Sequence, residues 1–215
     1  MTYLELINNV LVRLRETQVS SSNETTYSSL IGLFVNDAKR QIEDAYPWNV
    51  LGQTINVATS ASVYSYSIVG SGQKFQVQDV LNVTSNVEMR NISFSEMNRY
   101  QNFATPGVGI PTFYAFNGVD NNGDTKVTLY PRPDGVYSIP FSLTIGQPTL
   151  VSESTRVMVP GTLVAQNAYA RALVERGEDG GLNSSEAYQL YVSMLANHIA
   201  LEATRYPEYQ EFLAV

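Results

Sequence analysis

An α+β fold is predicted from three features: helical periodicity at both ends, apolar–polar alternation between them, and turns rich in glycine and proline. Apolar residues recur at helical spacing in residues 1–50 and 159–205, whereas residues 51–158 switch to a period of two. Two helical hairpins with apolar stripes are best buried against each other. We therefore expect a four-helix unit with an inserted antiparallel β module, followed by a tail over residues 206–215.

The N-terminal hairpin is predicted from two apolar stripes separated by a polar loop. Thr2 and Glu5 have the spacing of a capping box at the start of the first helix, which we expect over residues 1–17. The second helix is expected to end before Pro47, because proline disfavours a helical conformation in the preceding residue. Trp48 follows directly, and a large aromatic side chain there is more typical of a buried junction than of an exposed platform.

The β module is predicted from alternation and turn chemistry. Its clearest strand is Tyr137–Ile145, in which every second residue is apolar. Pro140 in this run has no N–H for a ladder, so we expect an edge strand. The Asp120–Asp124 segment predicts a hairpin turn, since it lacks the glycine and the glutamate of a calcium loop. A short helix is expected at residues 93–100.

The C-terminal hairpin is expected to begin at Pro160, and its second helix to cover Ser184–Arg205. His198 is the only histidine, and it lies mid-helix on the apolar stripe. This position favours a buried or half-buried side chain over a member of a catalytic triad. The residues predicted to face inward on this helix are Ala187, Leu190, Tyr191, Met194, Leu195, His198 and Leu201.

The composition excludes much catalytic and metal chemistry. With no cysteine and one histidine, the chain has no disulfide, no Cys-ligated zinc, no cysteine nucleophile and no multi-His metal site of its own. It shows no nucleophile elbow, no phosphate-binding loop and no spaced acidic pair of the kind glycosidases use. We therefore expect no enzymatic activity, no cofactor and no metal.

The charge and the hydropathy of the chain indicate which kinds of partner it does not bind. The net charge is −7 and Lys and Arg do not cluster, so adhesive binding to nucleic acid is not expected. The N-terminus lacks a basic leader and no apolar run is long enough to cross a bilayer, which predicts a cytoplasm-like compartment and no membrane partner. Few charges and 14 tyrosines suit a protein that makes extensive protein–protein contacts.

An acidic cluster lies near the end of the third long helix. It consists of Glu175, Glu178 and Asp179. One interpretation is an ordinary solvated loop. The other is that repeated copies of the chain form a ring whose lumen carries these charges.

The order of elements and three short motifs resemble the head-to-tail adaptor proteins of short-tailed bacteriophages, also called gatekeeper or tail tubular protein A-like proteins. The motifs are Tyr46-Pro47-Trp48-Asn49-Val50, the pair Pro111–Phe116 and Val127–Pro133, and the segment Ala172–Glu178. The resemblance implies a structural virion protein that forms a twelve-fold ring beneath the portal. Such a ring continues the DNA channel and presents a platform to the tail nozzle and often to tail fibres.

The resemblance also implies places for the partners. Adaptor tails of this family commonly insert into the portal, which assigns the portal contact to Tyr206, Pro207, Tyr209, Phe212 and Leu213. The protein would assemble in the host cytoplasm and reside in the neck or tail of the virion. DNA would pass an acidic lumen without adhering, because like charges repel.

Two other functions stay open at this point. One is another neck or tail-completion protein, such as a stopper or a tube terminator. The other is a β-rich carbohydrate-binding module that uses Trp48 and surface tyrosines as its platform.

Overall fold

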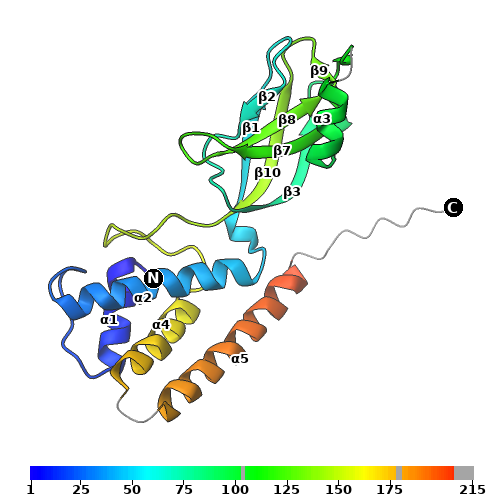
Figure 1. Ribbon diagram of the computed structural model, residues 1–215. Coiled ribbons are helices and arrows are strands. Elements are labelled where there is room, and N and C mark those ends of the chain that lie inside the picture. Colours follow the sequence, from blue (N-terminus) through cyan, green and yellow to red (C-terminus); the bar gives the residue numbers. More distant parts are fainter. Residues whose placement is uncertain (103–104, 178–180, 206–215) are drawn as a thin grey trace. The chain divides into compact units, whose positions relative to one another are not determined.

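The computed structural model describes residues 1–102, 105–177 and 181–205 and consists of two units (Figure 1). One unit combines Met1–Leu51 with the chain from Gly146 onward, and the other is Gly52–Ile145. The expected α+β architecture is confirmed: helices from both ends of the chain pack together, and β-sheets are inserted between them in sequence.

Over residues 1–51, 146–177 and 181–205, the helical unit contains four helices and one short 3-10 turn. The first helix begins with the expected capping box, in which Thr2 N–H donates to the Glu5 carboxylate (2.9 Å) and Glu5 N–H donates to Thr2 Oγ1 (3.3 Å). This helix is shorter than expected, because Arg15 has a left-handed backbone (φ 60°) that a helix does not continue through. The elements are α1 (Tyr3–Arg13), α2 (Thr26–Ala45), η1 (Asn49–Leu51), α4 (Gly161–Arg176) and α5 (Leu182–Arg205).

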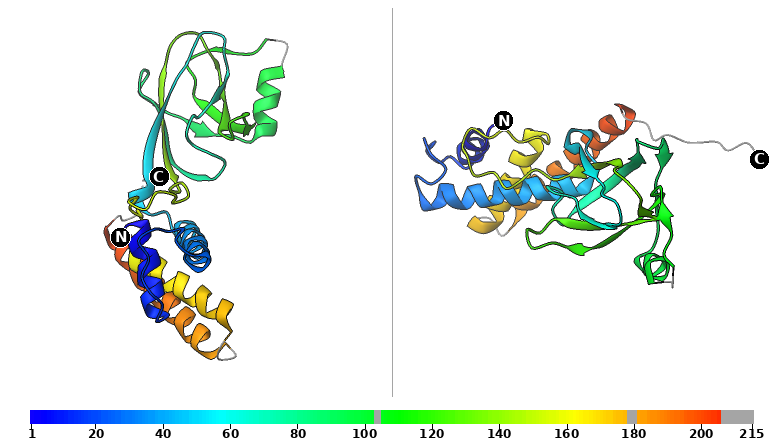
Figure 2. Two further views of the ribbon diagram at one scale, coloured as in Figure 1. Left: turned by 90° about the vertical axis from the view of Figure 1, so that its left-hand side faces the viewer. Right: turned by 90° about the horizontal axis from the view of Figure 1, so that it is seen from above.

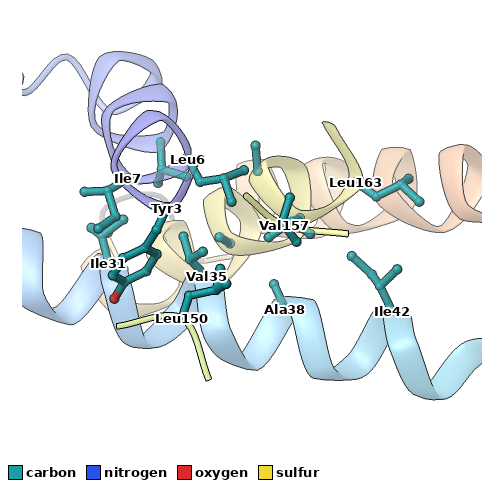
Figure 3. Packing of buried hydrophobic residues seen from close by; sticks show 14 of the residues in the cluster. Tyr3, Leu6, Ile7, Ile31, Val35, Ala38, Ile42, Leu150, Val157 and Leu163 are labelled. Atoms are coloured by element: carbon teal, nitrogen blue, oxygen red, sulfur yellow. The ribbon is translucent and has the colours of Figure 1, made fainter. Parts of the chain in front are cut away.

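The core of this unit joins α1, α2 and α4 to the segment that precedes α4 (Figure 3). Leu6, Val35 and Leu163 are fully buried, and burying such a side chain contributes about 1.5–3 kcal/mol. Leu150 and Val157 join the same core. Residues 146–158 therefore belong to the helical unit, whereas the sequence pattern grouped them with the β module.

The β unit contains two four-stranded sheets and one two-stranded sheet. Their strand orders are β1-β10-β3-β4, β2-β8-β7-β5 and β6-β9. Most pairs are antiparallel, as expected, but β5–β7 and β6–β9 are parallel. The elements are β1 (Gly52–Ala58), β2 (Ser65–Ser67), β3 (Phe75–Asn82), β4 (Val87–Glu88), β5 (Arg90–Asn91), α3 (Phe94–Asn102), β6 (Val108–Gly109), β7 (Phe113–Val119), β8 (Thr125–Tyr130), β9 (Arg132–Pro133) and β10 (Ser138–Ile145).

The expectation of an edge strand at Pro140 is wrong. β10 lies between β1 and β3, and Pro140 pairs with Asn56 of β1. Pairing with β3 begins only at Phe141, opposite Val80. The missing N–H of Pro140 therefore falls outside the β10–β3 ladder, which is why a central strand tolerates it.

Candidate assembly surfaces

Buried polar side chains of α2 hold the segment that leads from β10 to α4. Asn36 acts on the backbone of Leu150 as a neighbouring strand would: its Nδ2 donates to Leu150 O (3.1 Å) and its Oδ1 accepts from Leu150 N–H (2.8 Å). Both residues are buried. A buried amide with both groups satisfied fixes the path of the chain it binds.

An ion pair one turn further along α2 also holds the segment between β10 and α4. The Lys39 ammonium is completely buried, contacts the Glu43 carboxylate (3.1 Å) and donates to the carbonyl of Gln147. Burial raises the pKa of Glu43 above its usual range, and the nearby Lys39 only partly opposes that shift. No sequence signal suggested this pair, because Lys and Glu four residues apart usually lie on a solvated helix face.

Trp48 lies buried directly after α2. It is only 2% exposed, its indole N–H donates to Ile42 O (2.7 Å), and its ring meets the edge of Tyr46. Pro47 beside it is exposed. Trp48 therefore presents no face to a ligand, which removes the tryptophan from the platform of the carbohydrate-binding alternative.

The end of α4 is fixed by the residues after Glu175. Arg176 donates to the Tyr27 hydroxyl (2.9 Å) and to Leu14 O (3.2 Å), and it pairs with the Glu16 carboxylate. Gly177 then caps α4 with a left-handed backbone, φ 62°. Within the segment Ala172–Glu178, Arg176 thus has a structural role that the sequence did not indicate, whereas a helix end at Gly177 was expected from its glycine.

The predicted acidic cluster and tail are only partly covered by the structure. Glu175 is exposed on α4. Glu178 and Asp179 lie outside the described residues. The predicted portal-contact residues do as well: Tyr206, Pro207, Tyr209, Phe212 and Leu213.

The long helix α5 packs chiefly along α4 and continues past it (Figures 1 and 2). Its buried residues are Ser184, Ala187 and Tyr191. The expectation that Leu190 and Leu201 face inward is wrong: they are 54% and 64% exposed. The reason is that only one face of α5 is covered. His198 is half-buried, as the sequence pattern indicated.

A groove of about 460 Å³ lies between α2, α4 and α5. Arg171 lies in it, where its guanidinium donates to Gln41 Oε1 (2.9 Å) and stands 4.0 Å from the exposed Asp37 carboxylate. Apolar parts of Val174 and Tyr188 line it too, together with Asn167, Ala170, Ser184 and Ser185. The groove thus combines a weakly neutralised cation with apolar surface, a combination that suits a protein contact better than catalysis.

The amino-acid sequence identifies the family. A family model described as SU10 adaptor protein matches residues 1–210. The chain belongs to the SU10 adaptor protein family. SU10 adaptors are head-to-tail adaptors of the phage neck, so the predicted family is confirmed and the protein is a virion structural protein. No curated protein matches the sequence.

A second groove of this SU10 adaptor is lined mainly by polar residues. This wider groove of about 940 Å³ follows α1 and includes Glu5, Arg13 and Glu153. Hydrogen bonds from the Ser21 hydroxyl and the Ser22 N–H lower the pKa of Glu153. These bonds connect the polar loop before α2 to the segment before α4. Ser21, Ser22 and Glu153 therefore stabilise the fold.

The described residues of this SU10 adaptor contain neither a cluster of metal-ligating side chains nor a membrane-spanning helix. Among residues 1–102, 105–177 and 181–205, no three His, Cys, Asp or Glu side chains gather in a way that would hold a metal ion. None of the described helices combines the length and the apolar character needed to cross a membrane. Of the described tyrosines in the β unit, Tyr64 alone is exposed, and Arg132 stacks on its ring.

Proposed function

We propose that this protein forms a twelve-fold ring that joins the portal to the tail nozzle, carries no enzymatic activity and surrounds the DNA channel. The family match over residues 1–210 carries this proposal. The exposed apolar residues of α5 support it, because they offer apolar surface for a contact with another subunit. A ring has neighbours to cover it.

The proposal assigns two further contacts. Tyr206, Pro207, Tyr209, Phe212 and Leu213 insert into the portal, where their apolar side chains become buried. Glu175, with Glu178 and Asp179, faces the lumen and repels passing DNA. For these roles the helical unit, residues 1–51 and 146–205, supplies the ring contacts, and residues 206–215 supply the portal contact.

Assembly takes place in the host cytoplasm and ends in the neck of the virion. The direct test is electron microscopy of the protein mixed with the portal ring of the same phage. We expect particles with twelve adaptor copies on each portal. A protein that stays monomeric and shows no affinity for the portal contradicts the proposal.

The tail assignment has its own test. A chain ending at Arg205 should keep its circular dichroism spectrum and unfolding midpoint but lose portal binding. Replacing Tyr209, Phe212 and Leu213 together with serine should have the same effect, since these supply the apolar contact. Replacing Glu208 and Glu211 with glutamine is the matched control and should leave binding intact. Equal portal binding by all variants contradicts the assignment.

A further inference from the structure

Two different sides of α5 are left uncovered. Tyr188 and Val192 are four residues apart and so share one side, which borders the groove between α2, α4 and α5. Leu190 and Leu201 are three helical turns apart and share another side, about 200° around the helix from Tyr188. One exposed apolar side could be covered by a single partner. Two exposed sides would be covered by two partners, one on each side of α5.

The two sides differ in shape and charge. The first, which we call the α5 groove, is concave and holds Arg171 beside Val174 and Tyr188. The second, which we call the α5 ridge, consists of Glu186, Leu190 and Leu201, all exposed. Glu186 lies one turn before Leu190 and so on the same side. The groove thus offers a cation beside apolar surface, and the ridge offers an anion beside an apolar side chain.

The cation of the groove has room for a partner. One edge of Arg171 is occupied by Gln41 and Asn167, while its nearest carboxylate, Asp37, is 4.0 Å away and half exposed. Glu186 makes no ion pair within residues 1–102, 105–177 and 181–205. A second carboxylate approaching Arg171 would form a charge-assisted hydrogen bond of the kind guanidinium favours.

Both surfaces also occur at the same level of the helix. The α5 residues of the groove are Ser184, Ser185 and Tyr188, and the ridge begins with Glu186 and Leu190. A copy related by rotation about an axis roughly parallel to α5 can therefore place its ridge in the groove without a step along that axis. Contacts between unlike surfaces can close into a ring only when there is no step along the axis. With such a step they continue as a filament.

We propose that the α5 ridge of one copy occupies the α5 groove of the next, with Glu186 against Arg171 and Leu190 against Val174 and Tyr188. Leu201, three turns further along, meets the Val192 side of the same neighbouring helix. This inference rests on the proposed function, since it names the surfaces by which that ring forms. The occupant of the groove is a second copy of this chain.

A charge exchange tests the contact. Arg171→Glu and Glu186→Arg should each weaken ring formation by about tenfold, because a like-charged pair replaces an attractive one. In the double variant every copy carries both changes, so each contact again pairs an acid with a base, in the reverse order. Rings should therefore form again. Ring content is measured by mass photometry and electron microscopy, with and without the portal ring. Glu88→Arg, an exposed charge reversal in the β unit, is the matched control.

The apolar contact is tested with Leu190→Ser, matched by Leu33→Ser on α2, where the leucine is 63% exposed. Only the first should reduce ring content. Rings that form equally in all variants, or a double variant that is no better than the single ones, overturn this inference alone. The same holds if Leu190→Ser weakens portal or nozzle binding while rings persist. A wild-type protein that forms no ring even with its portal overturns the proposed function instead.

Discussion

The helices α2 and α5 have similar lengths but very different surroundings. Eight of the 20 residues of α2 are buried, including the polar Asn36 and the charged Lys39. Only three of the 24 residues of α5 are buried, and Leu182, Leu190 and Leu201 are more than half exposed. α2 thus buries polar side chains among its apolar ones, whereas α5 leaves large apolar side chains exposed.

The two helices therefore differ in role: α2 stabilises the fold of the chain, and the exposed side chains of α5 are available for contacts with other molecules. The polar residues of α2 hold backbone that has no regular partner, so their hydrogen bonds define the fold of this chain. The exposed apolar residues of α5 contribute little to that fold and remain available to other molecules. Substitutions in α2 should therefore change stability, and substitutions on α5 should change assembly.

The largest stability effect is expected from Lys39→Met. It leaves the Glu43 carboxylate buried without its cation, and breaking a buried pair from one side typically costs about 3–5 kcal/mol. Urea unfolding at neutral pH measures the loss. The double variant Lys39→Met/Glu43→Gln removes both charges and should recover much of it. A single variant as stable as wild type would show that the pair does not hold the Gln147 segment.

A smaller effect is expected from Trp48→Phe. The change keeps an aromatic ring but removes the N–H that donates to Ile42 O, which leaves that buried carbonyl short of a partner. The expected loss of unfolding free energy is about 1–2 kcal/mol. Tyr46→Phe, next to it, is the control and should leave stability almost unchanged. A loss no larger than that of the control contradicts the role of the indole hydrogen bond.

Two carboxylates should give pH dependences of opposite sign. The pKa of Glu43 is raised in the folded protein, so its contribution is fully present below the unfolded pKa and is lost as pH rises through the folded pKa. The pKa of Glu153 is lowered, so its contribution is present above the unfolded pKa and is lost as pH falls through the folded one. Carbon NMR titration should place Glu43 above Glu153. Unfolding curves of Glu43→Gln and Glu153→Gln should deviate from wild type in opposite directions, and the reverse order contradicts both assignments.

The smallest stability effect is expected on α5. Leu201→Ser should change the unfolding free energy by no more than about 0.5 kcal/mol, because the side chain is already 64% exposed. Thermal unfolding of the isolated protein measures this change. Ile42→Ser in α2, where the side chain is fully buried, is the opposite case and should cost several times more. Equal losses would mean that α5 is covered within a single chain.

The order of the elements could be predicted from the sequence because their periodicities are local. Thr2 and Glu5 satisfy the capping box through neighbours in the chain, and the alternation over Tyr137–Ile145 is visible without any partner strand. The roles of Asn36, Lys39 and Arg176 could not be predicted, since their partners lie more than 100 residues away. Leu190 and Leu201 were misplaced because an apolar stripe looks the same whether it faces a core or a partner.

The entry and exit strands of the β unit are paired with each other. Gly52 at the start of β1 lies opposite Thr144 near the end of β10. The points where the chain enters and leaves the β unit are therefore neighbours, roughly 5 Å apart. A tight turn could replace everything between them without moving α2 or α4. The core of the helical unit therefore makes few demands on what lies between β1 and β10, and a different insert could occupy that place in the chain.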